Sequence, residues 1–287
     1  MAAMREIPFI KMHGLGNDFV VLDGRKDRVV LTPEEVRAVA DRRRGVGCDQ
    51  LITIEPSESA NAFMRVHNAD GGEVAACGNA ARCVADRLMD ELGSETASLE
   101  TAAGVLGATR DGQGLVTIDQ GLARVEWHEI PLAREMDTLH IHLSSGAQTV
   151  SGLNDAVGVN VGNPHAVFFV DDAQSVDLAS IGPGLENHDL FPERANISVA
   201  QVLTRHSLRV RVWERGVGIT AACGTAACAV AVASARRELT ERSVEIELDG
   251  GSLQILWRDD GHVLMTGPVA TCFAGILDCA LLNGRAS

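Results

Sequence analysis

The sequence predicts an α+β protein built from two homologous halves, and three observations indicate this fold class. Helical and strand-like patterns occur together along the whole chain of 287 residues. A single internal offset of 146 residues relates several separate segments. The chain is also 46% hydrophobic, which gives each half enough apolar side chains for a core of its own.

The internal repeat is clearest around two cysteines, Cys77 and Cys223. Seven of ten positions are identical between residues 76–85 and residues 222–231. The same offset relates Gly16-Asn17 to Gly162-Asn163 and Gln50 to Asn196, and near residues 116 and 263 it becomes 147. Because one offset holds over separate segments, we interpret the chain as a duplication.

We expect the first half at residues 1–123, the second at residues 124–269 and a tail at residues 270–287 that packs back on the first half. The connection between the well-matched parts is expected at residues 126–151. Two duplicated halves are expected to pack about a pseudo-twofold axis. Equivalent residues would then face each other across a cleft between the halves, a usual place for a small-molecule site.

In the first half, strands are expected at residues 9–12, 19–22, 51–54 and 63–67. A helix is expected from residue 32 to residue 43, because Thr32 suits the N-cap, Pro33 the first helical position and Glu35 the capping box. Residues 68–72 read as a turn, and the Ala-rich residues 78–92 as a second helix.

The second half repeats this order. Strands are expected at residues 157–161, 167–170, 197–202 and 208–213, and an Ala-rich helix at residues 224–239. Three further strands are expected at residues 244–248, 253–257 and 263–265.

The composition excludes several classes of protein. A net charge of -14 argues against a nucleic-acid binder, which needs clustered Lys and Arg. We see no apolar signal region and no stretch that could span a bilayer, so the protein reads as soluble and cytoplasmic. Seven cysteines without a Cys-x-x-Cys pair predict reduced thiols, with no metal site. Apart from Cys77 and Cys223, the cysteines are expected in the core: Cys48, Cys83, Cys228, Cys272 and Cys279. His140 and His142 alternate on a possible strand, where exposure to solvent is favoured over metal binding.

Cys77 and Cys223 are each followed by Gly and an Ala-rich helix. A helix N-terminus offers free backbone N–H groups and the positive end of the helix dipole, so we expect a lowered thiol pKa and affinity for anions there. Two such thiols suggest inversion at one carbon: one thiolate removes a proton from one face, and the other thiol protonates the opposite face. The alternative from position alone is a pair of inert, buried cysteines.

The order and spacing of seven motifs resemble the diaminopimelate epimerase family over nearly the whole chain. These motifs are Gly14-Leu15-Gly16-Asn17-Asp18-Phe19, Gly47-Cys48-Asp49-Gln50, Asn68-Ala69-Asp70-Gly71, Ala76-Cys77-Gly78-Asn79, Gly162-Asn163-Pro164-His165, Trp213-Glu214-Arg215-Gly216 and Ala222-Cys223-Gly224-Thr225. The resemblance implies a curved sheet around a central helix in each half, and interconversion of LL- and meso-2,6-diaminopimelate. It also implies a homodimer, a role in lysine and peptidoglycan precursor biosynthesis and no cofactor; the chain has only two lysines, whereas pyridoxal phosphate needs one for its Schiff base.

The resemblance also implies roles for individual residues. The acid and base would be Cys77 and Cys223, with His165 and Glu214 assisting proton transfer at the thiols. The substrate would be held by amide side chains, by a Glu–Arg pair and by helix-start groups, namely Asn17, Gln50, Asn68, Asn163, Asn196, Glu214, Arg215, Gly78, Asn79, Gly224 and Thr225. Neutral amides suit a substrate with four charges, because they satisfy those charges without burying unpaired protein charge.

The chain departs from the family pattern at three positions. Ala80 and Ala226 stand where the family commonly has Gly, and Ile219 where a Glu often precedes the Thr. We expect these changes to affect the rate and the fine geometry of the site rather than the type of reaction. Two other classes stay open: an epimerase or racemase of proline-like substrates, and a non-catalytic binding or thiol-redox protein.

Overall fold

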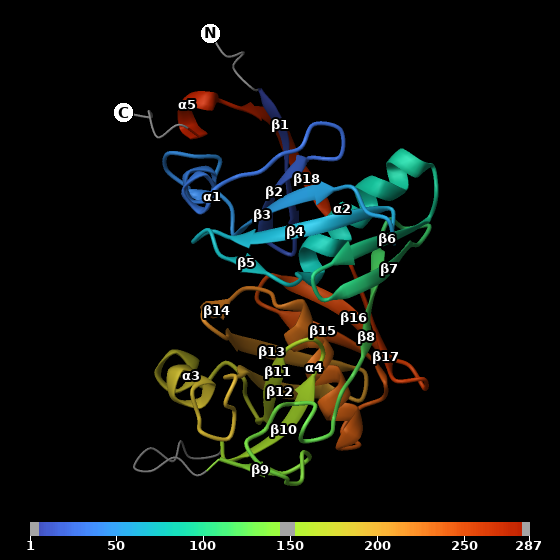
Figure 1. Ribbon diagram of the computed structural model, residues 1–287. Helices are drawn as coiled ribbons and strands as arrows, with labels where there is room; N and C mark the ends of the chain where they lie inside the picture. Colours follow the sequence, from blue (N-terminus) through green and yellow to red (C-terminus); the bar gives the residue numbers. More distant parts are fainter. Residues whose placement is uncertain (1–5, 144–152, 283–287) are drawn as a thin grey trace. The chain divides into compact units, whose positions relative to one another are not determined.

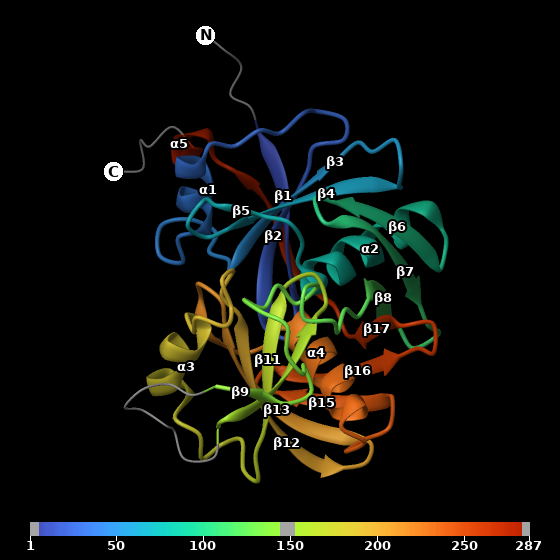
Figure 2. The same ribbon diagram turned by 60° about the horizontal axis from the view of Figure 1, so that its bottom comes forward.

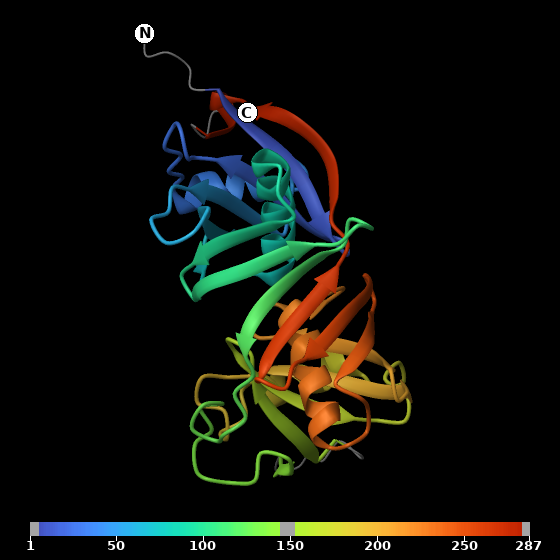
Figure 3. The same ribbon diagram turned by 90° about the vertical axis from the view of Figure 1, so that its right-hand side faces the viewer.

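The computed structural model describes residues 6–143 and 153–282, so the expected connection is described only in part. The chain forms two compact units. One comprises Met1–Ile118 together with Gly267–Ser287, and the other comprises Asp119–Thr266. The C-terminal segment therefore belongs to the same unit as the N-terminus, and its strand lies beside the first strand of the chain (Figure 3).

The first unit contains most of its strands before residue 119. Its elements are β1 (Ile7–Gly14), β2 (Asn17–Asp23), α1 (Pro33–Ala40), β3 (Gln50–Glu55), β4 (Ala62–Asn68), β5 (Glu73–Val74), α2 (Gly78–Leu92), β6 (Thr96–Thr101), β7 (Gly104–Arg110), the start of β8 (Val116–Leu122), β18 (Ala270–Leu277) and α5 (Cys279–Leu282). The second unit holds the end of β8, β9 (Ile141–His142), β10 (Asp155–Asn160), β11 (Pro164–Phe169), α3 (Leu178–Glu186), β12 (Asn196–Thr204), β13 (Ser207–Glu214), β14 (Gly218–Thr220), α4 (Gly224–Arg236), β15 (Ser243–Leu248), β16 (Gly251–Trp257) and β17 (His262–Gly267).

The strand pairings of the two units follow the same sequence. In the first, β1–β2, β3–β4, β4–β5, β6–β7 and β7–β8 are antiparallel, whereas β2–β3 and β4–β6 are parallel. In the second, β10–β11, β12–β13, β13–β14, β15–β16 and β16–β17 are antiparallel, whereas β11–β12 and β13–β15 are parallel. Each first strand has one more antiparallel neighbour, β18 for β1 and β9 for β10.

The register confirms the predicted repeat residue by residue. Leu51 lies opposite His67, and 146 residues later Ile197 lies opposite Trp213. After the helices the offset is 147, since Ala62–Leu99 corresponds to Leu208–Ile246. The helix ends explain the change. The backbone N–H of Ser94 donates to the Met89 carbonyl after α2, and that of Leu239 donates to the Ser234 carbonyl after α4. In the repeat, α4 therefore closes one residue earlier than α2, and the loop before β15 is longer than the loop before β6.

A mixed sheet curves around one central helix in each unit. In the first unit α2 packs on β1, β2, β6 and β7, and in the second α4 packs on β10 to β13, β15 and β16 (Figures 1 and 2). Residues Ala226 to Ser234 of α4 are all buried, which requires the small side chains of its Ala-rich sequence. The fold class predicted from the sequence, α+β with two homologous halves, is confirmed.

The outer helices lie on the other face of each sheet. The capping box that starts α1 is present, with Thr32 and Glu35 in their expected roles. The helix ends at Ala40 rather than near residue 43, because the Asp41 carboxylate takes the backbone N–H groups of Arg43 and Arg44 into a turn. The sequence analysis did not anticipate α3, α5, β5, β6, β7, β8, β14 and β18. Within the described part of the chain, no helix combines the length and the apolar character needed to span a membrane.

Candidate active site

Cys77 is the N-cap residue of α2 and is half-buried. Its Sγ lies 3.8 Å from Oδ1 of Asn17, which comes from the start of β2. The same oxygen accepts a hydrogen bond from Nδ2 of Asn79 at 3.2 Å. The turn between β1 and β2 therefore places a carbonyl oxygen directly at the thiol.

Asn79 is almost fully buried, and its side chain is engaged within the protein. Besides donating to Asn17, it accepts a hydrogen bond from Nη2 of Arg82 at 3.0 Å. Gly78 before it is buried as the first residue of α2. A helix that starts with Gly and a small buried side chain lets another chain segment approach its N-terminus closely.

Gln50 and Asn68 form a second pair of amides in the first unit. They face each other at the start of β3 and the end of β4, and Nε2 of Gln50 donates to Oδ1 of Asn68 at 2.9 Å. The remaining oxygen of Gln50 is buried and has no hydrogen-bond partner among the described residues. A buried acceptor of this kind is suited to a ligand's N–H group.

Cys223 is the N-cap residue of α4, with 6% of its surface exposed. Its Sγ lies 3.5 Å from Oγ1 of Thr225, and Gly224 between them is buried. Burial and the neighbouring carboxylate of Glu214 raise the pKa of the Cys223 thiol well above its ordinary value, although Thr225 and the backbone N–H of Ala226 act the other way. The expectation of a lowered pKa is therefore wrong for Cys223, because desolvation outweighs the helix N-terminus.

Glu214 ends β13, and its carboxylate accepts a short hydrogen bond from the hydroxyl of Thr220 on β14. The adjacent Arg215 donates from Nη1 to the Glu193 carbonyl at 2.8 Å. Its backbone N–H donates to Oδ1 of Asn196 at 3.0 Å. Asn196 also donates from Nδ2 to the Pro164 carbonyl at 3.1 Å, so both ends of this buried amide hold the backbone.

His165 on β11 is completely buried, and its Nε2 lies 2.7 Å from Oδ1 of Asn163. Burial, with a smaller effect of the Arg215 charge, lowers the pKa of His165 to about 3. The imidazole is therefore neutral at physiological pH. Since an amide oxygen only accepts, Nε2 carries the proton, and the buried Nδ1 has no hydrogen-bond partner among the described residues.

The remaining expectations about Cys and His have mixed outcomes. Cys48, Cys83 and Cys228 are buried as predicted, whereas Cys272 is exposed, because β18 is paired with β1 at the edge of the described sheet. Cys279 was also expected in the core, but its side chain lies outside the described residues. His140 and His142 are exposed, and His140 is paired with Asp155. Among the described residues, no cluster of three or more His, Cys, Asp or Glu side chains could hold a metal ion.

Several functional candidates were missed from the sequence. Glu186, only 5% exposed, accepts hydrogen bonds from Trp213, Gly216 and Arg194, and so supports the turn that carries Arg215. Thr220 holds Glu214. The signal for Arg82 was available in the sequence: it is the one long charged side chain among the residues 78–85 of an Ala-rich helix.

The fold is shared with epimerases. The structure of a hydroxyproline epimerase from Agrobacterium vitis superposes with a TM-score of 0.68 at 14% identity, covering 97% of this chain and 94% of that chain. A phenazine biosynthesis protein of the PhzF family from Bacillus anthracis gives 0.66 at 16% identity, covering 96% and 99%. These likenesses show that the chain shares a duplicated α+β fold class with those two proteins.

Sequence relatives give the family within this class. The family model for diaminopimelate epimerase matches residues 9–126 and 157–272. A diaminopimelate epimerase from Rhodospirillum centenum is 56% identical over 278 residues, which cover 96% of this chain and 94% of that protein. The chain belongs to the diaminopimelate epimerase family, and it is an enzyme of the isomerase class.

Proposed function

We propose that this enzyme interconverts LL- and meso-2,6-diaminopimelate, with Cys77 and Cys223 as the paired acid and base. The observation that carries the proposal is the equivalent placement of the two thiols, each at the N-cap of the central helix of its unit. The match to the family model over residues 9–126 and 157–272 supports the substrate.

The reaction needs one thiolate and one thiol at the same substrate carbon. The thiolate takes the Cα proton while the electron pair moves toward the substrate carboxylate, and the other thiol then gives its proton to the opposite face. At the end of each turnover the protonation states of the two cysteines are exchanged. For the other epimer, the same steps run in reverse. The helix N-termini stabilise the negative charge that develops on the carboxylate.

Glu214 and His165 are proposed to assist the proton transfers. The Glu214 carboxylate borders the Cys223 thiol, so it can receive the thiol proton and prepare the thiolate. His165 is neutral and offers one unprotonated ring nitrogen, as a proton acceptor must.

The substrate-binding residues are proposed from both units. Helix-start groups would bind the reacting carboxylate, and Arg215 would bind a carboxylate while Glu214 could bind an ammonium group. The amides would orient the remaining charges through hydrogen bonds. This set comprises Asn17, Gln50, Asn68, Gly78, Asn79, Asn163, Asn196, Glu214, Arg215, Gly224 and Thr225. Asn196 would contribute by fixing the Arg215 backbone.

The test is incorporation of deuterium at Cα of LL-diaminopimelate in D₂O, without added cofactor, for wild type, Cys77→Ala, Cys223→Ala and the matched control Cys272→Ala. We expect exchange with epimerisation in wild type and in Cys272→Ala, whose thiol is exposed on β18. Both other variants should lose epimerisation. Epimerisation retained in either of them would refute the two-cysteine mechanism. Absence of exchange in wild type would refute the substrate and direct the assay to proline-like amino acids.

We also propose that the enzyme is a cytoplasmic homodimer that serves lysine and peptidoglycan precursor biosynthesis. Phe273 and Ile276 on β18 are 50% and 59% exposed, and apolar side chains on an edge strand favour pairing with a second copy. Sedimentation analysis should give twice the mass of 30.4 kDa. Fractionation of cells should place the protein with soluble cytoplasmic markers, and a monomer or a membrane fraction would contradict this assignment.

A further inference from the structure

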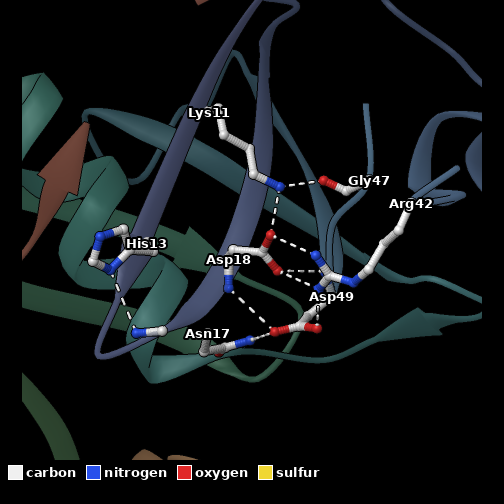
Figure 4. A network of polar contacts seen from close by, with 8 residues as sticks. Lys11, His13, Asn17, Asp18, Arg42, Gly47 and Asp49 are labelled. Carbon is white, nitrogen blue, oxygen red and sulfur yellow. Dashed lines mark hydrogen bonds and ion pairs between the residues drawn. The ribbon is translucent and has the colours of Figure 1, made fainter. Parts of the chain in front are cut away.

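The side-chain amide of Asn17 lies between Cys77 and Asp49. Its oxygen faces Sγ of Cys77 at 3.8 Å, and its nitrogen donates to Oδ2 of Asp49 at 3.0 Å. Asp49 itself precedes β3, and Figure 4 shows its carboxylate between the side chains of Asn17 and Arg42. Asn17 therefore connects the thiol to a group that the proposed mechanism does not use.

An amide can present either its oxygen or its nitrogen to a neighbour, and the groups around Asn17 decide which. A carboxylate only accepts hydrogen bonds, so Asp49 requires the Asn17 nitrogen. On the other side, the guanidinium of Arg82 only donates and requires the oxygen of Asn79. The Asn79 nitrogen is then left for the Asn17 oxygen, at 3.2 Å. Both ends of the chain of contacts impose the same direction on Asn17.

Asp49 is held firmly enough to impose this direction. Its Oδ1 accepts from Nη2 of Arg42 at 2.7 Å, and its Oδ2 also accepts the backbone N–H of Asp18 at 3.2 Å. The Asp18 carboxylate binds Arg42 and Lys11 in turn (Figure 4). Although burial acts to raise it, hydrogen bonds from Arg42 and Lys11 hold the pKa of Asp18 well below its ordinary value. Lys11 and Arg42 therefore keep the Asp18 carboxylate ionised, and Arg42 holds both aspartates in place.

We propose that Asp49 and Arg82 are positioning residues for Cys77, which fix the direction of the Asn17 amide so that a hydrogen-bond acceptor faces the thiol. The proposal rests on the proposed acid–base role of Cys77. An acceptor stabilises the S–H form, because a thiol can donate to it and a thiolate cannot. Cys77 is thereby kept as the proton donor of the unliganded enzyme, and substrate must rearrange or outcompete this contact before Cys77 acts as the base.

This arrangement exists in the first unit alone. The repeat places Ala195 at the position of Asp49, Thr225 at that of Asn79 and Cys228 at that of Arg82. These side chains cannot form the series of hydrogen bonds that fixes the direction of the Asn17 amide in the first unit. The Cys223 thiol has Thr225 and Glu214 as neighbours instead. The two equivalent cysteines are therefore adjusted by different means.

Other titratable groups of the first unit lie in this chain of contacts or on the elements beside it. They are Arg82 and Cys83 on α2, Lys11 and His13 on β1, Asp18 on β2, Arg42 and Asp49 before β3, and Cys272 on β18. Burial raises the pKa of Cys83 to about 12, so this thiol does not ionise in the working range. Within this set, Asp49 and Arg82 are the groups connected to the thiol through the two amides.

The experiment follows the alkylation of Cys77 by iodoacetamide between pH 6 and pH 10 in the full-length protein, with the Cys77 peptide quantified by mass spectrometry. The midpoint of the rate profile reports thiol ionisation, whereas its upper plateau reports access. Asp49→Ala removes one of the two constraints on the Asn17 amide, so its nitrogen can turn toward sulfur more often than in wild type. We expect the midpoint to fall and the rate at pH 7 to rise about fivefold, as for the loss of one hydrogen bond of about 1 kcal/mol.

Three comparison variants separate the effect of the Asn17 amide direction from the effects of charge and of folding. Asp49→Asn also removes the charge but keeps an acceptor for Asn17, so its midpoint should stay closer to wild type. Asp23→Ala removes an ion-paired aspartate at the other end of β2 and should leave the midpoint unchanged. Arg82→Met should shift the midpoint in the same direction as Asp49→Ala; since Arg82 is buried, Asp49→Ala keeps the test valid even if Arg82→Met does not fold.

Two results would overturn the proposal. Equal shifts in Asp49→Ala and Asp49→Asn would assign the effect to charge, and an unchanged midpoint with a higher plateau would assign it to access. Neither result depends on epimerase activity, so a failure of the proposed function in the deuterium assay remains distinct from a failure here.

Discussion

His165 occupies in β11 the position that Phe19 occupies in β2. Each lies opposite an amide residue across a parallel ladder, Phe19 opposite Gln50 and His165 opposite Asn196. Both side chains are completely buried. After the duplication, a titratable ring therefore stands in a place where the other half has an apolar one, and its depressed pKa follows from that burial.

The pKa of about 3 for His165 predicts a specific loss of stability in acid. The unfolded chain protonates this histidine near its ordinary pKa of about 6.5, whereas the folded protein does not, so unfolding takes up one proton below that pH. Stability due to His165 should fall by about 1.4 kcal/mol for each pH unit between about 6 and 3. Urea unfolding of wild type and His165→Phe at pH 7 and pH 5 measures it. Equal pH dependence in the two proteins would contradict the prediction.

Glu214→Gln is expected to lower the pKa of Cys223. Burial dominates the raised pKa and remains, but the repulsion between the thiolate and the carboxylate disappears. The rate of alkylation of Cys223 at pH 8 should therefore increase, with a lower midpoint in the pH profile. Glu193→Gln, at an exposed site beside the same loop, is the control and should behave as wild type. Epimerisation should nevertheless decrease, because the proposed base for Cys223 is lost.

Gly182→Ala is expected to destabilise the second unit by about 1–3 kcal/mol, whereas Gly184→Ala is not. Gly182 is buried in α3, and a methyl group there would overlap the indole ring of Trp213. Gly184 in the same helix is exposed and has open space around it, so Ala should be neutral or raise stability by up to ~1 kcal/mol through helix propensity. Urea midpoints decide between them, and equal midpoints would show that α3 yields to the added methyl group.

Glu238→Gly is expected to stabilise the protein by about 0.5–1 kcal/mol. Glu238 follows α4 with a φ of 57°, the left-handed conformation that Gly93 adopts after α2 with a φ of 60°. The exchange gives α4 the residue that suits this helix end, and Glu238 is exposed. The reverse change, Gly93→Ala, should destabilise by a similar amount, as measured by thermal unfolding. The prediction requires that the two variants change the stability of the protein in opposite directions.

Much of what could be predicted from the sequence was derived from the internal repeat. Its offset anticipated the equivalent strands and central helices of the two units, and the change of the offset to 147 near residues 116 and 263. It could also have placed α3, because α1 moved by 146 residues coincides with it. The sequence Gly182-Pro183-Gly184 concealed this helix, since those residues usually end helices and here are tolerated by packing on Trp213.

The candidate site was predictable in its residue types but not in its contacts. Both cysteines were identified from their position before Ala-rich helices. No pattern could show that the Asn196 amide holds backbone groups or that Asp49 orients Asn17, because these contacts join segments 19–32 residues apart. Desolvation likewise depends on everything packed around a thiol, so the raised pKa of Cys223 could not be anticipated from its helix.

The return of β18 to β1 has a consequence for how the protein is made. A ribosome completes Asp119–Thr266 before it releases the strand that pairs with β1, so the second unit can fold while the first still lacks one strand. Until then the outer edge of β1 offers unpaired backbone groups to any passing strand. A nascent chain stalled shortly after residue 266 should therefore be the species that most needs protection by chaperones.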